Sequence, residues 1–120
     1  MKRDTWNFYT AGRLNFGCGA VRRLAALIEP WGWKRILLVT DPALVKFGLA
    51  ERVVRPVKVA GSERRVLDGG EPEPSMEAAQ AARAAAAEFQ PQAILGLGGG
   101  SNMDLAKVTA VVHTHGGEFS

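Results

Sequence analysis

The stretch of this 120-residue sequence best suited to chemistry is a glycine-rich turn with two polar residues after it: Gly98, Gly99, Gly100, Ser101 and Asp104. Ser101 and Asp104 have the spacing of a helix N-cap and its third residue, so we expect a helix to begin there. The first N–H groups of a helix carry partial positive charge, and glycines let an anion approach because no Cβ is in the way. The turn is therefore predicted to bind a phosphate, although the same glycines could serve only to turn the chain out of a buried strand.

Two better-known phosphate motifs do not fit this turn. Gly96 and Gly98 begin a G-x-G-x-x-G, but Ser101 occupies the third glycine position, and no lysine follows a glycine as a P-loop requires. An alternative phosphate site is the pair Gly17 and Gly19, which also precedes a helical pattern. Its third glycine position is occupied by Arg22, so a hairpin that leads into a surface helix is the preferred interpretation there.

Asp41 is the second candidate for chemistry. It follows an uninterrupted apolar run, residues 36–39, which is typical of a strand covered on both faces. Open α/β sheets place ligand-contacting residues at the carboxyl ends of their strands. Asp41 also precedes Pro42 and could simply cap the next helix. The residues themselves leave both roles open.

Strand and helix patterns alternate along the chain, which predicts an α/β domain with a mostly parallel sheet flanked by helices. The strand that feeds the glycine turn is residues 93–97, and the helix after it continues through residue 112. The other predicted elements are an N-terminal β-hairpin (6–10 and 13–16), a helix stopped by Pro30 and Gly32, a partly helical segment (43–59) broken at Gly48 and Pro56, a strand (65–67) and an irregular loop (68–74). A last helix is capped by Ser75, continues through Phe89 and is ended by Pro91.

Composition excludes several classes of function. The chain is 47% hydrophobic and 22% charged, as is usual for one globular domain, and it has no apolar run of transmembrane length and no signal peptide. Its formal charge of +3 comes from scattered arginines without interleaved aromatic residues, so we expect no nucleic-acid partner and no membrane partner. A single cysteine fits a reducing compartment, which favours the cytoplasm.

No catalytic or metal-ligating residue is predicted within these 120 residues. Cys18 has no cysteine partner for a disulfide or a zinc site, and nothing in the sequence marks it as reactive. His113 and His115 are two residues apart, so on a helix their side chains point in different directions and do not form a metal pair. They are interpreted as surface or helix-end histidines.

The glycine turn resembles a signature of a known family. Residues 98–107 are similar to the G-G-G-S-x-x-D-x-x-K of the iron-containing alcohol dehydrogenases. Three earlier segments resemble that family's landmarks in the same order: residues 15–21 its F-G-x-G-A, residues 36–41 its V-T-D, and residues 68–74 its D-G-x-x-P-x-P. Four ordered matches over nearly the whole chain are far more specific than any one of them.

The resemblance implies a Rossmann-like fold with an N-terminal β-hairpin, and an oxidoreductase that interconverts an alcohol with an aldehyde or ketone. It implies cofactor binding by Asp41, Gly98, Gly99, Gly100, Ser101 and Asp104. In the family the aspartate faces the adenosine ribose, where a carboxylate accepts from the 2′-hydroxyl and repels a 2′-phosphate, so NAD is implied over NADP. A homodimer is also implied.

The family's iron, or another divalent metal, is held by an aspartate and three histidines on a second, helical domain. That domain is expected to lie beyond residue 120, so residues 1–120 are expected to form an incomplete N-terminal dinucleotide-binding domain without activity of its own. The chain would then be a truncated gene product or a fragment. Two alternatives stay open: a fragment of a dehydroquinate-synthase-like or glycerol-dehydrogenase-like relative, and a non-catalytic assembly fragment.

Overall fold

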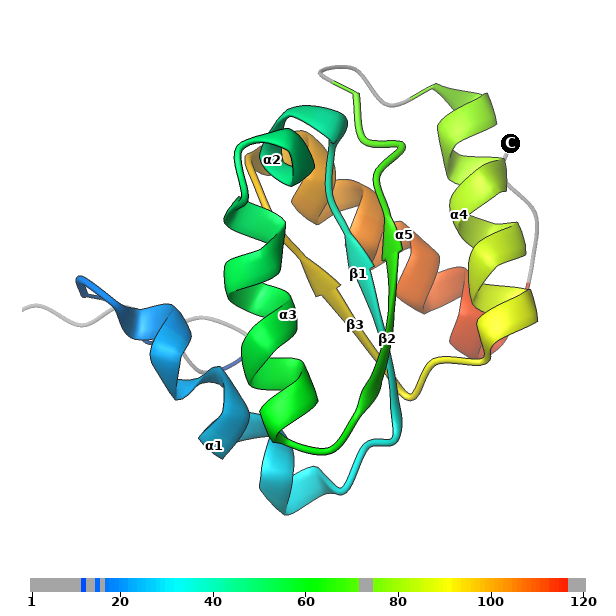
Figure 1. Ribbon diagram of the computed structural model, residues 1–120. Coiled ribbons are helices and arrows are strands. Elements are labelled where there is room, and N and C mark those ends of the chain that lie inside the picture. Colours follow the sequence, from blue (N-terminus) through cyan, green and yellow to red (C-terminus); the bar gives the residue numbers. More distant parts are fainter. Residues whose placement is uncertain (1–11, 13–14, 16, 72–74, 117–120) are drawn as a thin grey trace, which may run out of the picture.

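The protein folds as an α/β domain around a short parallel sheet (Figure 1). The computed structural model describes residues 12, 15, 17–71 and 75–116. Within them the strand order is β2-β1-β3, with β1 at Arg35–Val39, β2 at Glu63–Leu67 and β3 at Ala93–Gly96. Both neighbours pair with β1 in parallel. The predicted fold class is confirmed, whereas the predicted N-terminal hairpin falls almost wholly outside the described residues.

Strand β1 is the centre of the core, and its four apolar residues are all buried. Because side chains alternate across a strand, they divide between the two faces of the sheet. Leu37 and Val39 pack with helices α4 (Met76–Phe89) and α5 (Gly100–His115). Leu38 packs with helix α3 (Leu49–Val59). Figure 1 shows α3 on one face of the sheet and α4 and α5 on the other.

The first helical segment is a run of three short pieces before β1. They are η1 at Ala20–Arg23, α1 at Leu24–Ile28 and η2 at Glu29–Trp31. The predicted stop at Pro30 and Gly32 is confirmed, because the α-helical part ends at Ile28, just before Pro30. Pro30 lies at the start of the short 3-10 turn η2, where its missing N–H costs no helical bond. Gly32, in the left-handed region with φ 64°, ends it. The rings of Trp31 and Trp33 then stack with centroids 5.3 Å apart.

The segment between β1 and β2 forms two helices, α2 (Pro42–Lys46) and α3. The predicted break at Gly48 is confirmed, since Gly48 has φ 80° between them. The predicted break at Pro56 was wrong, because α3 runs through this residue to Val59. Val53, Val54 and Val57 are buried on either side of Pro56. Burial of such side chains contributes about 1.5–2 kcal/mol each, which offsets the roughly 3 kcal/mol that an internal proline costs.

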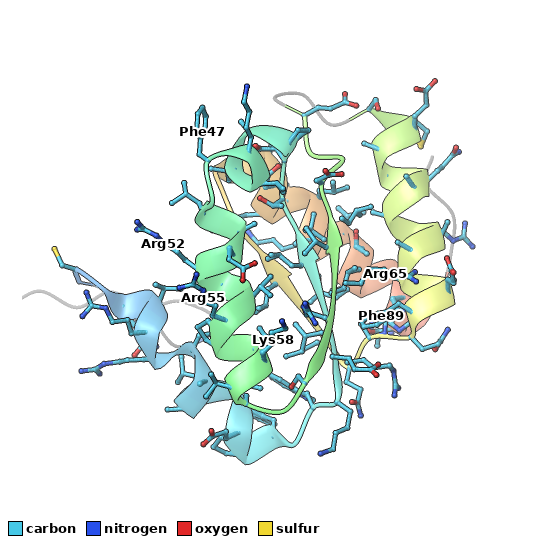
Figure 2. The ribbon with its side chains drawn as sticks, viewed as in Figure 1. Phe47, Arg52, Arg55, Lys58, Arg65 and Phe89 are labelled. Atoms are coloured by element: carbon cyan, nitrogen blue, oxygen red, sulfur yellow. The ribbon has the colours of Figure 1, made fainter. Side chains whose placement is uncertain are left out.

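Strand β2 begins at Glu63, two residues before the predicted start, and helix α4 begins and ends as predicted. The side chain of Ser75 caps α4, because its Oγ accepts from the N–H of Ala78 at 3.1 Å. Arg65 joins β2 to the far end of α4 (Figure 2): its guanidinium carbon lies 5.3 Å from the Phe89 ring centroid, and its Nη1 lies 3.2 Å from Glu88 Oε2. In the described part of the chain, no helix has the length and apolarity needed to cross a membrane.

Candidate functional site

The candidate site is a pocket at the carboxyl ends of β1 and β3. Because the strands are parallel, their carboxyl ends meet at one edge of the sheet, and α2 and α5 both begin there. The pocket has a volume of about 540 Å³. Its lining comes from three segments: Asp41, Pro42 and Ala43; Gly70 and Glu71; and Gly99, Gly100, Ser101 and Asn102.

Asp41 has a structural role and also faces the pocket. It is the N-cap of α2, and its Oδ1 accepts from the N–H of Leu44 at 3.0 Å. Its Oδ2 accepts from Nδ2 of Asn102 at 2.8 Å. The hydrogen bond from Leu44, which has the largest effect, and the one from Asn102 hold the pKa of the Asp41 carboxyl below its usual value. Partial burial acts in the opposite direction. The capping role is therefore confirmed, and the pocket receives an ionised carboxylate.

Asn102 is the residue of this site that the sequence analysis missed. It is only 3% exposed, although it lies in the first turn of α5. Besides its bond to Asp41, its Nδ2 donates to the carbonyl oxygen of Leu97 at 2.9 Å, and Thr40 Oγ1 donates to the same oxygen at 3.0 Å. Helical periodicity was the signal available in the sequence, because the buried residues of α5 recur at i, i+3, i+4 and i+7: Asn102, Leu105, Ala106 and Thr109.

The glycines around the pocket serve two different purposes. Gly98 has φ 131°, and a Cβ there would collide with the amide nitrogen of Asn102. A Cβ at Gly70 would collide with Asn102 Oδ1 and would lie 2.6 Å from the carbonyl oxygen of Thr40. At Gly99 and Gly100 a Cβ would meet nothing within 4 Å. Close packing thus requires the first two glycines, whereas the other two leave open space beside the start of α5.

Helix α5 begins at Gly100, so the prediction that Ser101 is its N-cap was wrong. Gly98 and the extended Gly99 already redirect the chain, and the first helical bond runs from the N–H of Met103 to the Gly99 carbonyl at 3.1 Å. The N-cap is therefore Gly99, which has no side-chain oxygen to offer the first N–H groups. At Gly99 and Gly100 the start of the helix presents only backbone to the pocket, and Ser101 and Asn102 complete the lining there.

The predicted site residues do not all reach the pocket. Asp41, Gly99, Gly100 and Ser101 line it, whereas Gly98 packs against Asn102. Asp104 is outside the lining, and its Oδ1 lies 3.9 Å from Lys107 Nζ on the exposed side of α5.

The alternative glycine pair, Gly17 and Gly19, is also outside this pocket's lining. It leads into η1, which packs on α3.

The described residues offer no metal centre. Among them, no group of three or more histidine, cysteine, aspartate and glutamate side chains is arranged to hold a metal ion. His113 and His115 lie in the last turn of α5, and Cys18 is an exposed free cysteine in the turn before η1.

The sequence of this chain was compared with protein families and with individual proteins. Residues 11–120 match the family described as iron-containing alcohol dehydrogenase. Long-chain-alcohol dehydrogenase 1 of Geobacillus thermodenitrificans is 40% identical over 104 residues, which cover 87% of this chain and 26% of that protein. The NADPH-dependent butanol dehydrogenase of Clostridium saccharobutylicum is 31% identical over 100 residues, which cover 83% of this chain and 25% of that protein.

Solved structures agree with the sequence comparison. The crystal structure of NADH-dependent butanol dehydrogenase A from Thermotoga maritima superposes with a TM-score of 0.83 at 27% identity, covering 95% of this chain and 29% of that one. The chain thus spans about a quarter of the length of the curated relatives it matches. The Rossmann-like fold and the four landmarks inferred from the sequence are consistent with these matches, and the chain belongs to the iron-containing alcohol dehydrogenase family.

Proposed function

We propose that this chain is the nucleotide-binding portion of an NAD-dependent, metal-containing alcohol dehydrogenase, which interconverts a small alcohol and its aldehyde or ketone. Residues 1–120 supply an incomplete dinucleotide-binding domain. The metal and most of the substrate pocket belong to a further, helical domain of the protein. Membership of the family supports this division.

The observation that carries the proposal is the pairing of an open helix start with a carboxylate across one pocket. The N–H groups at the start of α5 face the pocket beside Gly99 and Gly100, where open space suits a pyrophosphate. Asp41 lines the same pocket and accepts from the ribose hydroxyls. When bound, the nicotinamide cofactor supplies the hydride chemistry. The residues of this chain bind and orient the cofactor.

NAD is the proposed cofactor because of Asp41. An ionised carboxylate accepts from the 2′-hydroxyl of NAD and repels the 2′-phosphate of NADP. The relatives named above include an NADH-dependent and an NADPH-dependent butanol dehydrogenase, so membership of the family does not decide this preference. The negative charge of Asp41 is what supports NAD.

The oligomeric state and the cellular location of the protein are proposed on other grounds. We propose a homodimer, as the family resemblance implies. We also propose a cytoplasmic enzyme, which the single cysteine of the sequence supports. The partner of the complete site is a small-molecule alcohol or aldehyde.

The proposal is tested by titrating the isotope-labelled full chain with NADH and following its backbone amide resonances. We expect the largest shifts at Gly99, Gly100 and Asn102, with NADPH producing them only at higher concentration. Shifts centred on Gly17 and Gly19 would move the phosphate site to the alternative turn. A spectrum that NADH leaves unchanged would contradict nucleotide binding by this chain.

A further inference from the structure

We propose that Asn102 is a positioning residue, which fixes the carboxylate of Asp41 in the pocket and thereby sets the preference for NAD over NADP. The inference rests on the proposed function, because it concerns recognition of the ribose in the same pocket. It adds a residue that touches the cofactor only through Asp41.

The amide of Asn102 ties together the ends of two strands. Its Nδ2 carries two protons, and its two acceptors are Asp41 Oδ2 at 2.8 Å and the Leu97 carbonyl oxygen at 2.9 Å. Asp41 follows β1 and Leu97 follows β3, so one side chain joins both carboxyl ends. Both of its N–H donors are committed, and the amide therefore has a single favourable orientation.

Packing enforces that orientation. Asn102 is 3% exposed, and even a Cβ at Gly98 or Gly70 would collide with its amide group. The side chain thus packs against two positions where only glycine fits, and this close packing favours the rotamer that it adopts.

The carboxylate of Asp41 is consequently held at both oxygens. The N–H of Leu44 from α2 occupies Oδ1, and Asn102 from α5 occupies Oδ2. A carboxylate has about four acceptor sites, and the N–H groups of Leu44, Asn102 and Ala43 use at most three of them, so one remains for a hydroxyl group of the ligand.

A held carboxylate discriminates more strongly than a mobile one. A mobile aspartate could rotate away from a 2′-phosphate and relieve the repulsion, whereas a fixed one cannot. Rejection of NADP then comes from a repulsive group that the fold keeps in place.

The first test compares Asn102→Ala with Thr109→Val in the full chain. Thr109 is also buried on α5, and its Oγ1 donates to the Leu105 carbonyl oxygen. Thr109→Val therefore removes one buried hydrogen bond, as Asn102→Ala removes that to Asp41, but at a residue outside the pocket lining. We expect Asn102→Ala to lower the ratio of the NADPH Kd to the NADH Kd about tenfold, the effect of losing one hydrogen bond to a charged group. Thr109→Val is expected to leave the ratio unchanged. Equal ratios in all three proteins would overturn the proposal.

Two further variants separate positioning from a structural role. In an Asp41→Ala background, Asn102→Ala should no longer change the ratio, since there is no carboxylate left to position. Asn102→Asp places a second carboxyl group against Asp41, and at about pH 5 the pair shares a proton, so the introduced group donates as the amide did. NADH affinity of this variant is expected near the wild-type value at about pH 5 and about tenfold weaker at about pH 8. An affinity that does not vary with pH would count against positioning.

A measurement without nucleotide distinguishes this inference from the proposed function. Carbon-detected NMR of the Asp41 carboxyl gives its pKa in each variant, and Asn102→Ala should raise it toward the ordinary aspartate value while Thr109→Val does not. If wild-type chain binds no NADH, the proposed function fails, and this pKa still decides whether Asn102 acts on Asp41. An Asp41 pKa that is the same in wild type and Asn102→Ala overturns the positioning role, whatever the nucleotide binding.

Discussion

The turn before η1 and the turn before α5 both contain glycines, and these glycines serve different purposes. In the turn before η1, both Gly17 and Gly19 have positive φ, at 147° and 74°. In the turn before α5 only Gly98 does, while Gly99 and Gly100 have ordinary backbone angles and open space around them. Glycine is needed for conformation in the first turn and at Gly98. At Gly99 and Gly100 the fold does not require it.

The difference supports the ligand site proposed above. A glycine that neither its φ nor its neighbours require leaves room for a ligand to come close to the backbone. The turn before α5 also opens a helix of 16 residues and faces Asp41 across a pocket, whereas η1 has four residues. Similar sequence patterns thus have different physical causes, and substitutions can separate them.

The largest expected effect is that of Gly100→Val. A Cβ there meets nothing within 4 Å, so we expect the fold to be retained, but the new side chain occupies the space beside the helix start where we place the pyrophosphate. NADH affinity is expected to fall at least about 100-fold, as two or more charge-assisted hydrogen bonds are lost. Calorimetric titration measures the affinity, and thermal unfolding checks the fold.

Gly69→Val is the matched control for this change. Gly69 also has open space, but it is outside the pocket lining, so NADH affinity should remain. A folded Gly100→Val protein that binds NADH as the wild type does would mean that the glycines at the start of α5 are not the phosphate site.

The next effect concerns stability and compares Gly98→Ala with Gly17→Ala. Both residues have positive φ, but only at Gly98 would the new Cβ collide with another residue, namely Asn102. Gly98→Ala is expected to cost about 2–4 kcal/mol and Gly17→Ala about 1 kcal/mol, because strain adds to overpacking only in the first case. Urea unfolding measures both, and equal costs would contradict the tight packing around Asn102.

A smaller effect is expected for Asp41→Gly, and it is measured as a change in the preference for NADH over NADPH. Without the carboxylate, the 2′-hydroxyl of NAD loses an acceptor and the 2′-phosphate of NADP is no longer repelled. The ratio of the NADPH Kd to the NADH Kd should fall about tenfold or more. Asp104→Asn removes a carboxylate outside the pocket lining and serves as the control. An unchanged ratio in Asp41→Gly would leave Asp41 as a helix cap only.

The smallest effect is a pH dependence of stability that comes from Asp41. Hydrogen bonds lower its pKa in the folded protein below the ordinary value of 3.8, so its stabilisation is complete above that value and is lost as the pH falls through the folded pKa. The difference in Tm between wild type and Asp41→Asn should therefore stay constant from neutral pH down to about pH 5 and shrink below it. A constant difference down to about pH 3 would show that the charge of Asp41 is not what stabilises α2.

The local sequence pattern was sufficient to predict those elements whose structure depends on only a few neighbouring residues. The apolar run of β1, the Ser75 cap of α4 and the break at Gly48 are each decided within a few residues, and each was predicted. The order of the four landmarks likewise indicated the family. Pro56 was misjudged because the burial of its neighbours on the sheet, which no local rule contains, keeps α3 intact.

The candidate site was predicted less completely for a similar reason. Asp41 and Asn102 are 61 positions apart, and their contact exists only once β1 and β3 lie side by side. Sequence spacing left the cap and the ligand role of Asp41 as alternatives, whereas the structure lets one carboxylate cap α2 and still line the pocket. The start of α5 was misplaced because Ser101 matched a capping pattern that the turn at Gly98 and Gly99 already made unnecessary.

The stacked indoles of Trp31 and Trp33 provide this protein with a built-in optical probe. Their planes are 6° from parallel, and they precede β1 in the chain, whereas the pocket lies at the carboxyl ends of the strands. Closely stacked chromophores couple electronically, and the turn at Gly32 maintains the stack only while this end of the chain is folded. Near-ultraviolet circular dichroism of the pair can therefore report on folding in any of the variants above, separately from whether the pocket is filled.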